Sequence, residues 1–361
     1  MLYLKSIDIY TWDGDTQVVV GYMQKRDVRE AVKGIVLKSV KLQLKQYAFL
    51  ILFAALLFVS FSAYSEPVGD LAARFSEESD IAYEETTYRL RKRLTTVLLA
   101  GTDQRMGYAP AENEYRNGGQ ADFLLLVVID DNRDTVQPIL LNRDTMTRIT
   151  VLNLMGNVSG TRMAQICLAH GFGDGMEQSC ELLRDAVSGL LLNVPIDYYA
   201  AMNLDGIAAF NDALGGVEVT LEEDLTVYDP AMYPGATLVL KGMQAEYYVR
   251  ERYYVGDQTN ISRMNRQMNY MNLAAQKLAE SAATDQSFVN TLVGAVSPMV
   301  VTDMNKGAMA NLTSRAVEYE LLPILTIDGE AVQGNGGFME FYPDEESLQK
   351  VVLEAFYAPV D

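Results

Sequence analysis

The sequence contains few of the side chains that bind transition metals or act in hydrolytic triads. Among 361 residues there are one histidine, His170, and two cysteines, Cys167 and Cys180. This scarcity excludes a three-histidine zinc centre, a four-cysteine zinc site and an iron–sulfur cluster carried by this chain alone. No G-x-S-x-G sequence is present, and a single histidine argues against a serine-hydrolase triad.

The chain is also short of positive charge. It has 29 Lys and Arg side chains against 48 Asp and Glu, a formal net charge of −19 at pH 7. Because a protein that binds duplex DNA needs a basic surface to neutralise phosphates, this balance argues against that class. Disorder is excluded for most of the chain, since 49% of its residues are hydrophobic and 21% are charged.

One long segment lacks both charge and proline. Residues 47–64 read YAFLILFAALLFVSFSAY, and as a helix they would cover about 27 Å, close to the roughly 30 Å hydrocarbon core of a bilayer. Seven Lys and Arg residues lie between Lys25 and Lys45, so the positive-inside rule predicts a cytoplasmic amino end and an extracellular remainder. A cleaved signal peptide is the alternative, but the segment is long for that purpose and lies far from Met1.

The predicted span divides the charge unevenly. Residues 1–64 carry 8 basic and 5 acidic side chains, net +3, and the remainder carries 21 basic and 43 acidic ones, net −22. We predict four parts: a cytoplasmic basic tail over 1–46, a transmembrane helix over 47–64, an extracellular stalk over 65–93 and one domain over 94–361. Met23 is an alternative start that would leave a shorter basic tail.

Apolar strands and amphipathic helices alternate within the predicted domain. Strands are predicted at 95–100, 123–129, 136–141, 217–221 and 337–342. The uninterrupted run FLLLVVI at 123–129 is typical of a central strand covered on both faces. Helices are predicted at 177–192, 204–214, 263–283 and 345–357, the first three with apolar residues on one face. This alternation predicts an α/β fold class with helices packed on a central sheet.

Charged residues stand at the predicted strand ends and in turns, where packing does not require them. The set consists of Asp103, Asp122 and Arg143 beside the strands, Arg250 and Arg252, and Arg263, Arg266 and Gln267 on one helix face. Arg250 and Arg252 are two residues apart, which in an extended chain puts both guanidinium groups on one side. Ligands of open α/β sheets bind at strand ends. The guanidinium fork matches phosphate oxygens, and Mg²⁺ is held by one or two carboxylates together with substrate phosphates. The set therefore predicts a metal–pyrophosphate site, with ordinary structural ion pairs as the alternative.

Six stretches of this sequence carry a resemblance to a known family. They are LLAGTDQR (98–105), ADFLLLVVID (121–130), LNRDTMTRI (141–149), IDYYAAMNLDGIAAFNDALGGVEV (196–219), YVRER (248–252) and ISRMNRQ (261–267). In order and spacing, and behind one predicted transmembrane helix, they resemble the LytR–CpsA–Psr family of membrane-anchored cell-wall enzymes over residues 94–361. The resemblance implies a single catalytic domain with a central mixed β-sheet flanked by helices.

The resemblance also implies an activity. Members of the family are thought to be phosphotransferases that move a phosphate-linked glycopolymer, such as a teichoic acid or a capsular or secondary wall polysaccharide, from a polyprenyl-pyrophosphate carrier to peptidoglycan. The implied partners are therefore this lipid-linked glycopolymer, the peptidoglycan acceptor and the membrane, and no nucleic acid. The implied cofactor is Mg²⁺ or Mn²⁺, and an apolar tunnel between sheet and helices is expected for the isoprenoid tail.

Roles follow by matching positions to the family pattern. The resemblance assigns the metal to Asp103 and Asp122. It assigns pyrophosphate contacts to Arg143, Arg250, Arg252, Arg263, Gln267 and Arg105, and catalytic roles to Arg143, Arg250, Arg252 and Asn260.

Two positions depart from that pattern. Gln120 stands where the family commonly has arginine, and Asn260 stands where it often has aspartate. Asn260 is expected to cap the helix that follows. If the usual aspartate helps to deprotonate the acceptor, a neutral amide would not perform that role.

Smaller features receive structural interpretations. Cys167 and Cys180 are predicted to lie outside the membrane, where they could form a disulfide; two buried free thiols are the alternative. His170 is expected to be a surface or turn residue, and 171–175 a turn leading into a helix rather than a nucleotide-binding loop.

Two other function classes remain open from the sequence. One is a hydrolase that only cleaves the lipid pyrophosphate, and the other is a non-catalytic, lipid-binding regulatory protein of the cell envelope. The neutral residues Gln120 and Asn260 favour the second class mildly. A transcriptional regulator fits poorly, because nothing before residue 47 resembles a DNA-reading pair of helices.

Overall fold

The computed structural model describes residues 80–105, 118–153, 155–285, 288–305, 307–308, 311–312, 315 and 319–360. The predicted basic tail, the predicted span at 47–64 and most of the predicted stalk lie outside these residues. Within the described part of the chain, no helix is both long and apolar enough to cross a membrane.

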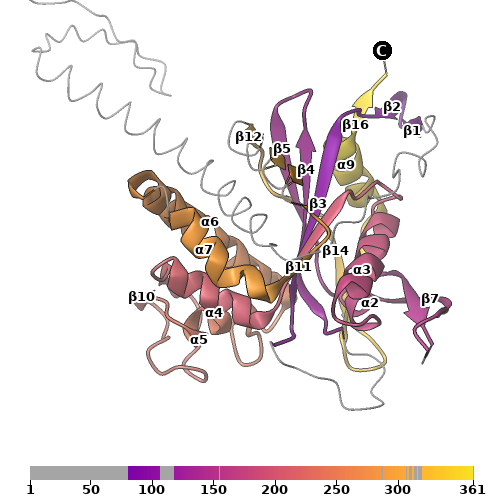
Figure 1. The fold of residues 1–361 in the computed structure, drawn as a ribbon. Helices are drawn as coiled ribbons and strands as arrows, with labels where there is room; N and C mark the ends of the chain where they lie inside the picture. Colours follow the sequence, from indigo (N-terminus) through magenta and orange to yellow (C-terminus); the bar gives the residue numbers. More distant parts are fainter. Residues whose placement is uncertain are drawn as a thin grey trace, which may run out of the picture. The chain divides into compact units, whose positions relative to one another are not determined.

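A mixed sheet forms the centre of the described domain (Figure 1). Its strands run in the order β11-β8-β3-β4-β5-β12, and β13 also pairs with β5. Their bounds are β3 Leu94–Thr102, β4 Ala121–Asp130, β5 Thr135–Leu140, β8 Tyr198–Met202, β11 Val300–Thr302, β12 Glu320–Leu321 and β13 Leu325–Thr326. The pairs β3·β4, β4·β5 and β8·β11 are antiparallel, whereas β3·β8, β5·β12 and β5·β13 are parallel. The predicted fold class, α/β with a central mixed sheet, is confirmed.

The continuous apolar run of β4 explains its central position. Residues from Leu124 to Ile129 are 0–1% exposed, because the strand is paired on both edges and packed on both faces. Such a strand buries every side chain, so its sequence shows no alternation of polar and apolar residues.

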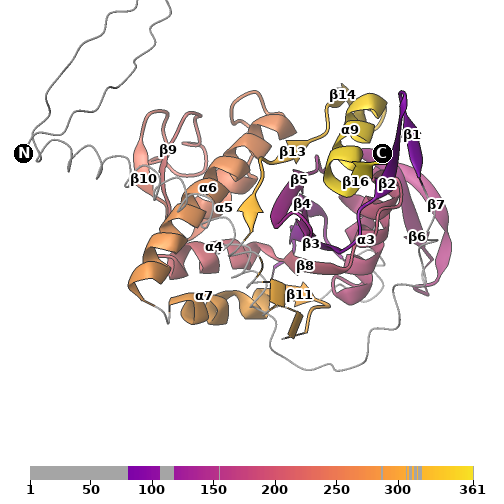
Figure 2. The same ribbon diagram turned by 90° about the horizontal axis from the view of Figure 1, so that it is seen from above.

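Helices cover both faces of the sheet (Figure 2). On one side lie α2 Leu168–Gly171, α3 Glu177–Leu190 and α9 Glu345–Phe356, and on the other α4 Leu204–Ala213, α5 Met243–Arg250, α6 Asn260–Thr284 and α7 Phe288–Val296. The predicted apolar stripe of α3, including Cys180, Leu183 and Val187, is buried against the sheet together with Val352 and Phe356 of α9. The result is a three-layer arrangement in which two cores share one sheet.

Several short strands lie outside the central sheet. They form three antiparallel pairs: β6 Met146–Leu152 with β7 Val158–Gln165, β9 Glu218–Thr220 with β10 Thr237–Val239, and β14 Gly329–Gln333 with β15 Met339–Pro343. A short 3-10 helix, η2, covers Ser297–Met299. Of these strands only β9 and β15 correspond to predicted strands. The others carry few consecutive apolar residues, so their sequence does not distinguish them from loops.

The predicted stalk needs correction over residues 81–90. Strands β1 Ile81–Tyr83 and β2 Thr86–Leu90 form a small sheet with the carboxyl-terminal strand β16 Tyr357–Pro359. The backbone N–H of Arg91 also donates to the Phe356 carbonyl at 2.8 Å. These residues therefore belong to the folded domain: exposed and half-buried side chains alternate along both strands, and Ile81, Tyr83, Tyr88 and Leu90 pack against the core.

Candidate active site

The residues singled out at the strand ends lie around one polar cavity. Because β3 and β4 are antiparallel, the end of β3 at Thr102 pairs with the start of β4 at Ala121, which brings Asp103 and Asp122 together. Arg143 follows β5, whose last residues pair with Leu125 and its neighbours. The cavity has a volume of about 450 Å³ and is lined by Asp103, Gln120, Asp122, Arg143, Gln165, Leu168, Arg250, Glu251, Arg252, Tyr253, Arg263 and Phe338.

Arg143 is the second most buried arginine of the cavity wall. Its guanidinium group donates to Asp122, to the Gln120 amide oxygen and, at 3.0 Å, to Cys167 Sγ. Its Nε lies 3.3 Å from Asp144 Oδ1. Burial opposes the charge, but the surrounding acceptors, among them Asp122, keep the pKa of Arg143 above its ordinary value. Arg143 is therefore permanently charged.

Asp122 is the carboxylate on which three arginines converge. It pairs with Arg143, and its Oδ2 lies 4.0 Å from Arg250 Nε and 3.9 Å from Arg263 Nη1. Asp144, Glu246 and Glu251 also contact cavity arginines, so these guanidinium groups share several carboxylates. A bound phosphate could still contact several of the arginines at once.

Arg263 is the most buried of these arginines. It is 3% exposed, and its pKa is lowered to about 10, chiefly by burial; Asp122 opposes this shift, and the neighbouring charges of Arg143 and Arg252 add to it. In addition, the buried Nε atoms of Arg143, Arg250 and Arg263 have no hydrogen-bond acceptor within the described part of the chain. Unpaired donors on buried cations are costly, and phosphate oxygens are suitable acceptors for them.

Asp103 lies at the edge of the same cluster. Its Oδ1 accepts a hydrogen bond from the Gln120 backbone N–H at 2.6 Å. Burial raises the pKa of Asp103, and the nearby charge of Asp122 raises it further, while Arg143 and Arg250 lower it. Gly119 permits this approach, because its φ is 66° and a Cβ there would lie 2.7 Å from Asp103 Oδ1.

Asp103 and Asp122 could bind a hard divalent cation only if other ligands complete its coordination. Among the described residues, no group of three or more His, Cys, Asp or Glu side chains could hold a metal. Asp103 and Asp122 supply two carboxylates on one cavity wall, and Mg²⁺ is commonly bound by one or two carboxylates plus substrate phosphates. The donor set is therefore compatible with a metal that arrives with, or is completed by, a phosphorylated ligand.

Helix α6 holds the chain that carries Arg250 and Arg252. Arg266 Nε donates to the Tyr248 carbonyl at 2.9 Å, and its Nη2 donates to the Glu251 carbonyl. Gln267 Nε2 donates to the Val249 carbonyl at 3.0 Å. These carbonyls belong to the end of α5 and the residues after it, where a helix leaves its last C=O groups unpaired. We call this set of bonds the α6 clamp.

The backbone at 250–252 is not the extended segment that was predicted. Arg250 is the last residue of helix α5, and only Glu251 is extended. Both guanidinium groups nevertheless line the cavity, and Arg252 Nη1 lies 3.3 Å from Asp144 Oδ2.

Three other predicted site residues lie elsewhere or make other contacts. Arg105 pairs with Asp205 at 2.9 Å and with Glu246 at 2.7 Å, and it is not among the cavity-lining residues. Gln267 uses its amide N–H groups on the backbone of α5 and lines the neighbouring apolar cavity. Asn260 donates to Asn142 Oδ1 at 2.6 Å and accepts a hydrogen bond from Arg263.

The predicted helix cap at Asn260 is wrong by one residue. Thr259 is the N-cap of α6, and its side chain accepts a hydrogen bond from the Ser262 N–H. Asn260 is the first residue of the helix, and its side chain is 6% exposed and faces Arg263 and Asn142. The sequence alone allows both Thr259 and Asn260 as caps, because both residue types are favoured there.

Sequence reasoning missed several supporting residues. Glu246 is buried in α5 and lies between Arg105 and Arg250, 3.8 Å from Arg250 Nη1. Gln165 lines the cavity and links Asp144 to the Met339 carbonyl. Arg266 was placed on the correct helix face, but nothing in its spacing indicated that it binds backbone carbonyls.

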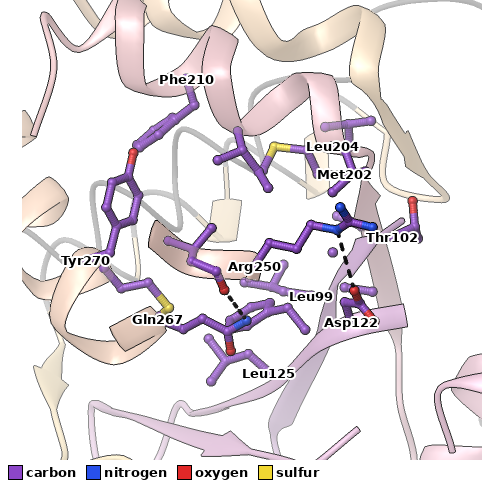
Figure 3. Close-up of a pocket in the computed structure, with 18 residues that line it drawn as sticks. Leu99, Thr102, Asp122, Leu125, Met202, Leu204, Phe210, Arg250, Gln267 and Tyr270 are labelled. Atoms are coloured by element: carbon purple, nitrogen blue, oxygen red, sulfur yellow. Dashed lines mark hydrogen bonds and ion pairs between the residues drawn. The ribbon is translucent and has the colours of Figure 1, made fainter. Parts of the chain in front are cut away.

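An apolar cavity of about 150 Å³ adjoins the polar one between the sheet and helices α4, α5 and α6 (Figure 3). Its walls include Leu99, Leu125, Met202, Leu204, Ile207, Phe210, Tyr270 and Met271. Asp122 and Arg250 line both cavities, and Figure 3 shows them facing each other at the junction. An apolar cavity therefore lies between sheet and helices, where the family resemblance implied a tunnel for the isoprenoid tail.

The two cysteines are not bonded to each other, which corrects the predicted disulfide. Both thiols are free and buried. Cys167 Sγ is 3.0 Å from Arg143 Nη2, whereas Cys180 Sγ is 3.9 Å from His170 Nε2 on the other side of α2. Burial raises the pKa of Cys167 to about 11, so the thiol is neutral. The alternative of two buried thiols is the correct one.

His170 is buried rather than exposed. It lies in the short helix α2 with 1% of its surface accessible, and its Nδ1 donates to the Gly119 carbonyl at 3.1 Å. The imidazole thus supports the backbone that carries Gln120 beside Asp103. Residues 171–175 form the predicted turn into α3.

Comparisons with known proteins identify relatives of this chain. Residues 69–355 match the model of the LytR_cpsA_psr family. The cell wall biosynthesis protein LcpA of Corynebacterium glutamicum is 28% identical over 273 residues, which cover 66% of this chain and 52% of LcpA. The polyisoprenyl-teichoic acid–peptidoglycan teichoic acid transferase TagU of Halalkalibacterium halodurans is 24% identical over 75% of this chain and 80% of its own.

A solved structure shares the fold. Protein gbs0355 of Streptococcus agalactiae superimposes with a TM-score of 0.58 at 22% identity, covering 73% of this chain and 86% of its own. The mixed sheet with helices on both faces is therefore an arrangement already known in a crystal structure.

Proposed function

The chain belongs to the LytR–CpsA–Psr family, and from this premise we propose that it transfers a phosphate-linked glycopolymer from a polyprenyl-pyrophosphate carrier to peptidoglycan. Relatives whose names describe teichoic acid transfer to peptidoglycan support the proposal. The match covers only about half of LcpA.

One observation carries the proposal: a cationic cavity opens beside an apolar one, and Asp122 and Arg250 line both. A polyprenyl pyrophosphate has the same two chemical halves in the same order, an apolar chain followed by two phosphates. The apolar walls would take the isoprenoid chain, and the unpaired arginine donors would take the phosphate oxygens. A soluble nucleotide would leave the apolar cavity unused.

The arginines would supply most of the catalysis. Arg143, Arg250, Arg252 and Arg263 hold the diphosphate and offset the charge that accumulates on the leaving phosphate. An acceptor hydroxyl of peptidoglycan attacks the glycan-bearing phosphorus, the bond to the bridging oxygen breaks, and polyprenyl phosphate leaves. The hydroxyl proton passes to solvent or to the departing phosphate. Cleavage of the pyrophosphate drives the reaction, so no nucleotide is required.

We propose that Asp103 and Asp122 hold Mg²⁺ or Mn²⁺ together with the phosphates. When bound, the cation supplies further neutralisation of the phosphate oxygens. It would also offset the repulsion between the two carboxylates, which now raises the pKa of Asp103. The enzyme would act at the outer surface of the cell membrane, anchored by a single span with its amino end in the cytoplasm.

Substitution of the cavity arginines tests this function. Full-length chain in detergent is incubated with labelled polyprenyl-pyrophosphate-linked glycopolymer and peptidoglycan oligomers, and transfer is measured. Arg143→Ala and Arg252→Ala should each lower the rate by about 100-fold or more, the usual loss for one electrostatic donor. Arg148→Ala is the matched control, because Arg148 is exposed on β6 and does not line the cavity. Normal rates in both cavity variants would refute the assignment.

The same assay includes a metal arm. Chelation with EDTA should abolish transfer, and added Mg²⁺ or Mn²⁺ should restore it. Asp103→Asn should require more metal for half-maximal activity, since one carboxylate ligand is lost. Full activity in EDTA would show that the arginines act without a cation.

A second function, hydrolysis of the lipid pyrophosphate without transfer, is favoured by one observation. Asn260 is a neutral amide beside Arg263, so this chain lacks the carboxylate that the family often has there. Incubation of the labelled lipid with and without peptidoglycan oligomers distinguishes the two functions: a transferase produces labelled oligomer, and a hydrolase releases the same free phosphorylated glycan in both cases.

A further inference from the structure

Two exposed aromatic rings stand on the wall of the polar cavity. Tyr253 is 61% exposed and Phe338 is 71% exposed, yet both line the cavity that contains the arginines. They come from chain segments far apart in the sequence, the loop after α5 and the turn between β14 and β15. Neither ring is needed to fill a core, since most of its surface contacts solvent.

Tyr253 is held beside the arginines by defined contacts. The Arg252 guanidinium carbon lies 5.5 Å from the centre of the Tyr253 ring, and Arg252 itself pairs with Asp144. The Tyr253 carbonyl accepts a hydrogen bond from Tyr228 Oη at 2.9 Å. The backbone of Tyr253 is thus held by Tyr228, and its ring lies against the Arg252 guanidinium group.

The β14–β15 turn that carries Phe338 is linked to Asp144 by hydrogen bonds of its neighbouring residues. The turn itself is closed by a hydrogen bond from Gly334 N–H to the Phe338 carbonyl at 2.8 Å. Next to it, Gln165 Nε2 donates both to the Met339 carbonyl at 2.6 Å and to Asp144 Oδ1 at 3.1 Å. The Phe341 N–H also donates to the Asp144 carbonyl at 2.9 Å. Asp144 thus links Arg143, Arg252 and both aromatic segments.

The chemistry of these rings points to sugars rather than to lipid or peptide. A pyranose presents a flat face of C–H groups with hydroxyls around its edge, and an aromatic face carries the partial negative charge that attracts such C–H groups. Glu251 and Gln165 line the same cavity, and the Glu251 carboxylate and the Gln165 amide oxygen are acceptors that suit the hydroxyl edge. An isoprenoid chain would instead find its match in the separate apolar cavity.

We propose that Tyr253 and Phe338 form a stacking platform for a pyranose ring next to the phosphate site. This inference rests on the proposed function, because it names the substrate part that the site holds beyond the pyrophosphate. The sugar has two possible sources: the glycan attached to the leaving diphosphate, or the peptidoglycan strand that accepts it. The chemistry of recognition is the same for both, so the experiment separates them.

Binding is measured first, without any reaction. Full-length chain in detergent is titrated with chitotetraose, a soluble β-1,4-linked N-acetylglucosamine oligomer, by isothermal calorimetry. Tyr253→Ala and Phe338→Ala should each weaken binding by about ten-fold, the loss expected for one aromatic contact. Tyr253→Phe and Phe338→Tyr should bind as the wild type does, since they keep the ring. Tyr254→Ala and Tyr233→Ala are the controls: both rings are exposed, at 78% and 55%, and neither lines the cavity.

Transfer kinetics then identify the source of the sugar. If the platform holds the acceptor, the alanine variants raise the KM for peptidoglycan oligomers and leave the KM for the lipid donor unchanged. If it holds the donor glycan, the alanine variants raise the KM for the lipid donor and leave the KM for peptidoglycan oligomers unchanged. Hydrolysis of the donor without acceptor slows as well. Either pattern supports the platform.

Failure of the platform and failure of the proposed function give different results. Wild-type affinity for chitotetraose and unchanged KM values in both alanine variants, in a chain that transfers glycopolymer, overturn the platform alone. Weaker sugar binding in the alanine variants of a chain that neither transfers nor cleaves the lipid supports the platform and refutes the function.

Discussion

The side chain at position 260 shows how a single residue is matched to its neighbours. Asn260 donates to Asn142 Oδ1 and accepts from Arg263, while Asn142 Oδ1 also accepts the Asp144 N–H at 3.0 Å. An amide satisfies a donor and an acceptor at once, which a carboxylate cannot do. The neutral residue is therefore consistent with its surroundings, although it differs from the common family pattern.

Substitution of Asn260 separates its two contacts. Asn260→Ala should lower the free energy of unfolding by about 1–3 kcal/mol, because it leaves buried polar groups of Arg263 and Asn142 without partners. Asn260→Asp keeps the acceptor for Arg263 but replaces the donor to Asn142 Oδ1 by a carboxylate oxygen, so its loss in stability reports on the Asn142 contact alone. Chemical denaturation of both variants measures the difference; equal losses would mean that the Arg263 contact contributes nothing.

The single histidine allows a direct test of burial. Burial lowers the pKa of His170, and hydrogen bonds to Gly119 and Gly118 oppose this only in part. The folded state thus binds a proton less readily than the unfolded state, whose histidine titrates near 6.5. Stability from this group is complete above pH 6.5 and is lost as the pH falls towards the folded pKa, by at most about 1.4 kcal/mol per pH unit.

The measurement should follow the imidazole itself. Asp303, whose pKa burial raises to about 6, has the opposite effect on stability between pH 4 and 6, so a global unfolding curve would combine the two. An NMR titration of the one histidine signal should give a pKa below 6.5. A value at or above 6.5 would mean that the ring is solvated.

At the scale of secondary structure, the contact between α5 and α6 organises the site. The α6 clamp satisfies carbonyls at the end of α5 and so fixes the direction of Arg250 and Arg252. The periodicity of the sequence predicted α6 itself but not this contact, because α5 is short and its aromatic run YYVRERYY shows no clear helical period. Helix α6 was thus predictable, whereas α5 and the hydrogen bonds between the two helices were not.

Loss of the clamp should reduce activity without removing any group from the cavity wall. Arg266→Met should lower stability by about 1–3 kcal/mol and slow transfer at a temperature where the variant is folded. Lys277→Met is the control, because Lys277 binds the Gly215 and Gly216 carbonyls after α4 from the same helix. It should cost stability but leave the activity of the folded protein unchanged. Equal activity in both variants would exclude a positioning role for Arg266.

At the scale of the molecule, the carboxyl-terminal strand closes the domain onto its first described residues. Tyr357 pairs with Leu90, and the Arg91 side chain donates to the carbonyls of Glu354 and Ala355. Both segments therefore belong to one folding unit that begins before the predicted boundary at 94.

Removal of the Tyr357 ring should weaken this closure. Tyr357 is 5% exposed, so Tyr357→Ala should lower the free energy of unfolding by about 3–5 kcal/mol, the usual loss for a buried aromatic residue. Tyr342→Ala is the control, since Tyr342 is 45% exposed on β15. Thermal unfolding compares the two. Similar melting temperatures would show that β16 contributes little to the domain.

The sequence by itself determined the parts of this protein that depend on local pattern. The apolar run at 123–129, the stripe of α3 and the charged residues at strand ends each follow from residue types a few positions apart. Only the tertiary structure decided which charges meet. Arg105 and Arg263 are chemically identical, but one pairs with Asp205 and Glu246 while the other lines the cavity. Likewise, Cys167 and Cys180 have different partners, and Tyr253 and Phe338 line the same cavity. Such pairings depend on how strands and helices that are far apart in the sequence pack together. Patterns a few residues long do not specify that packing.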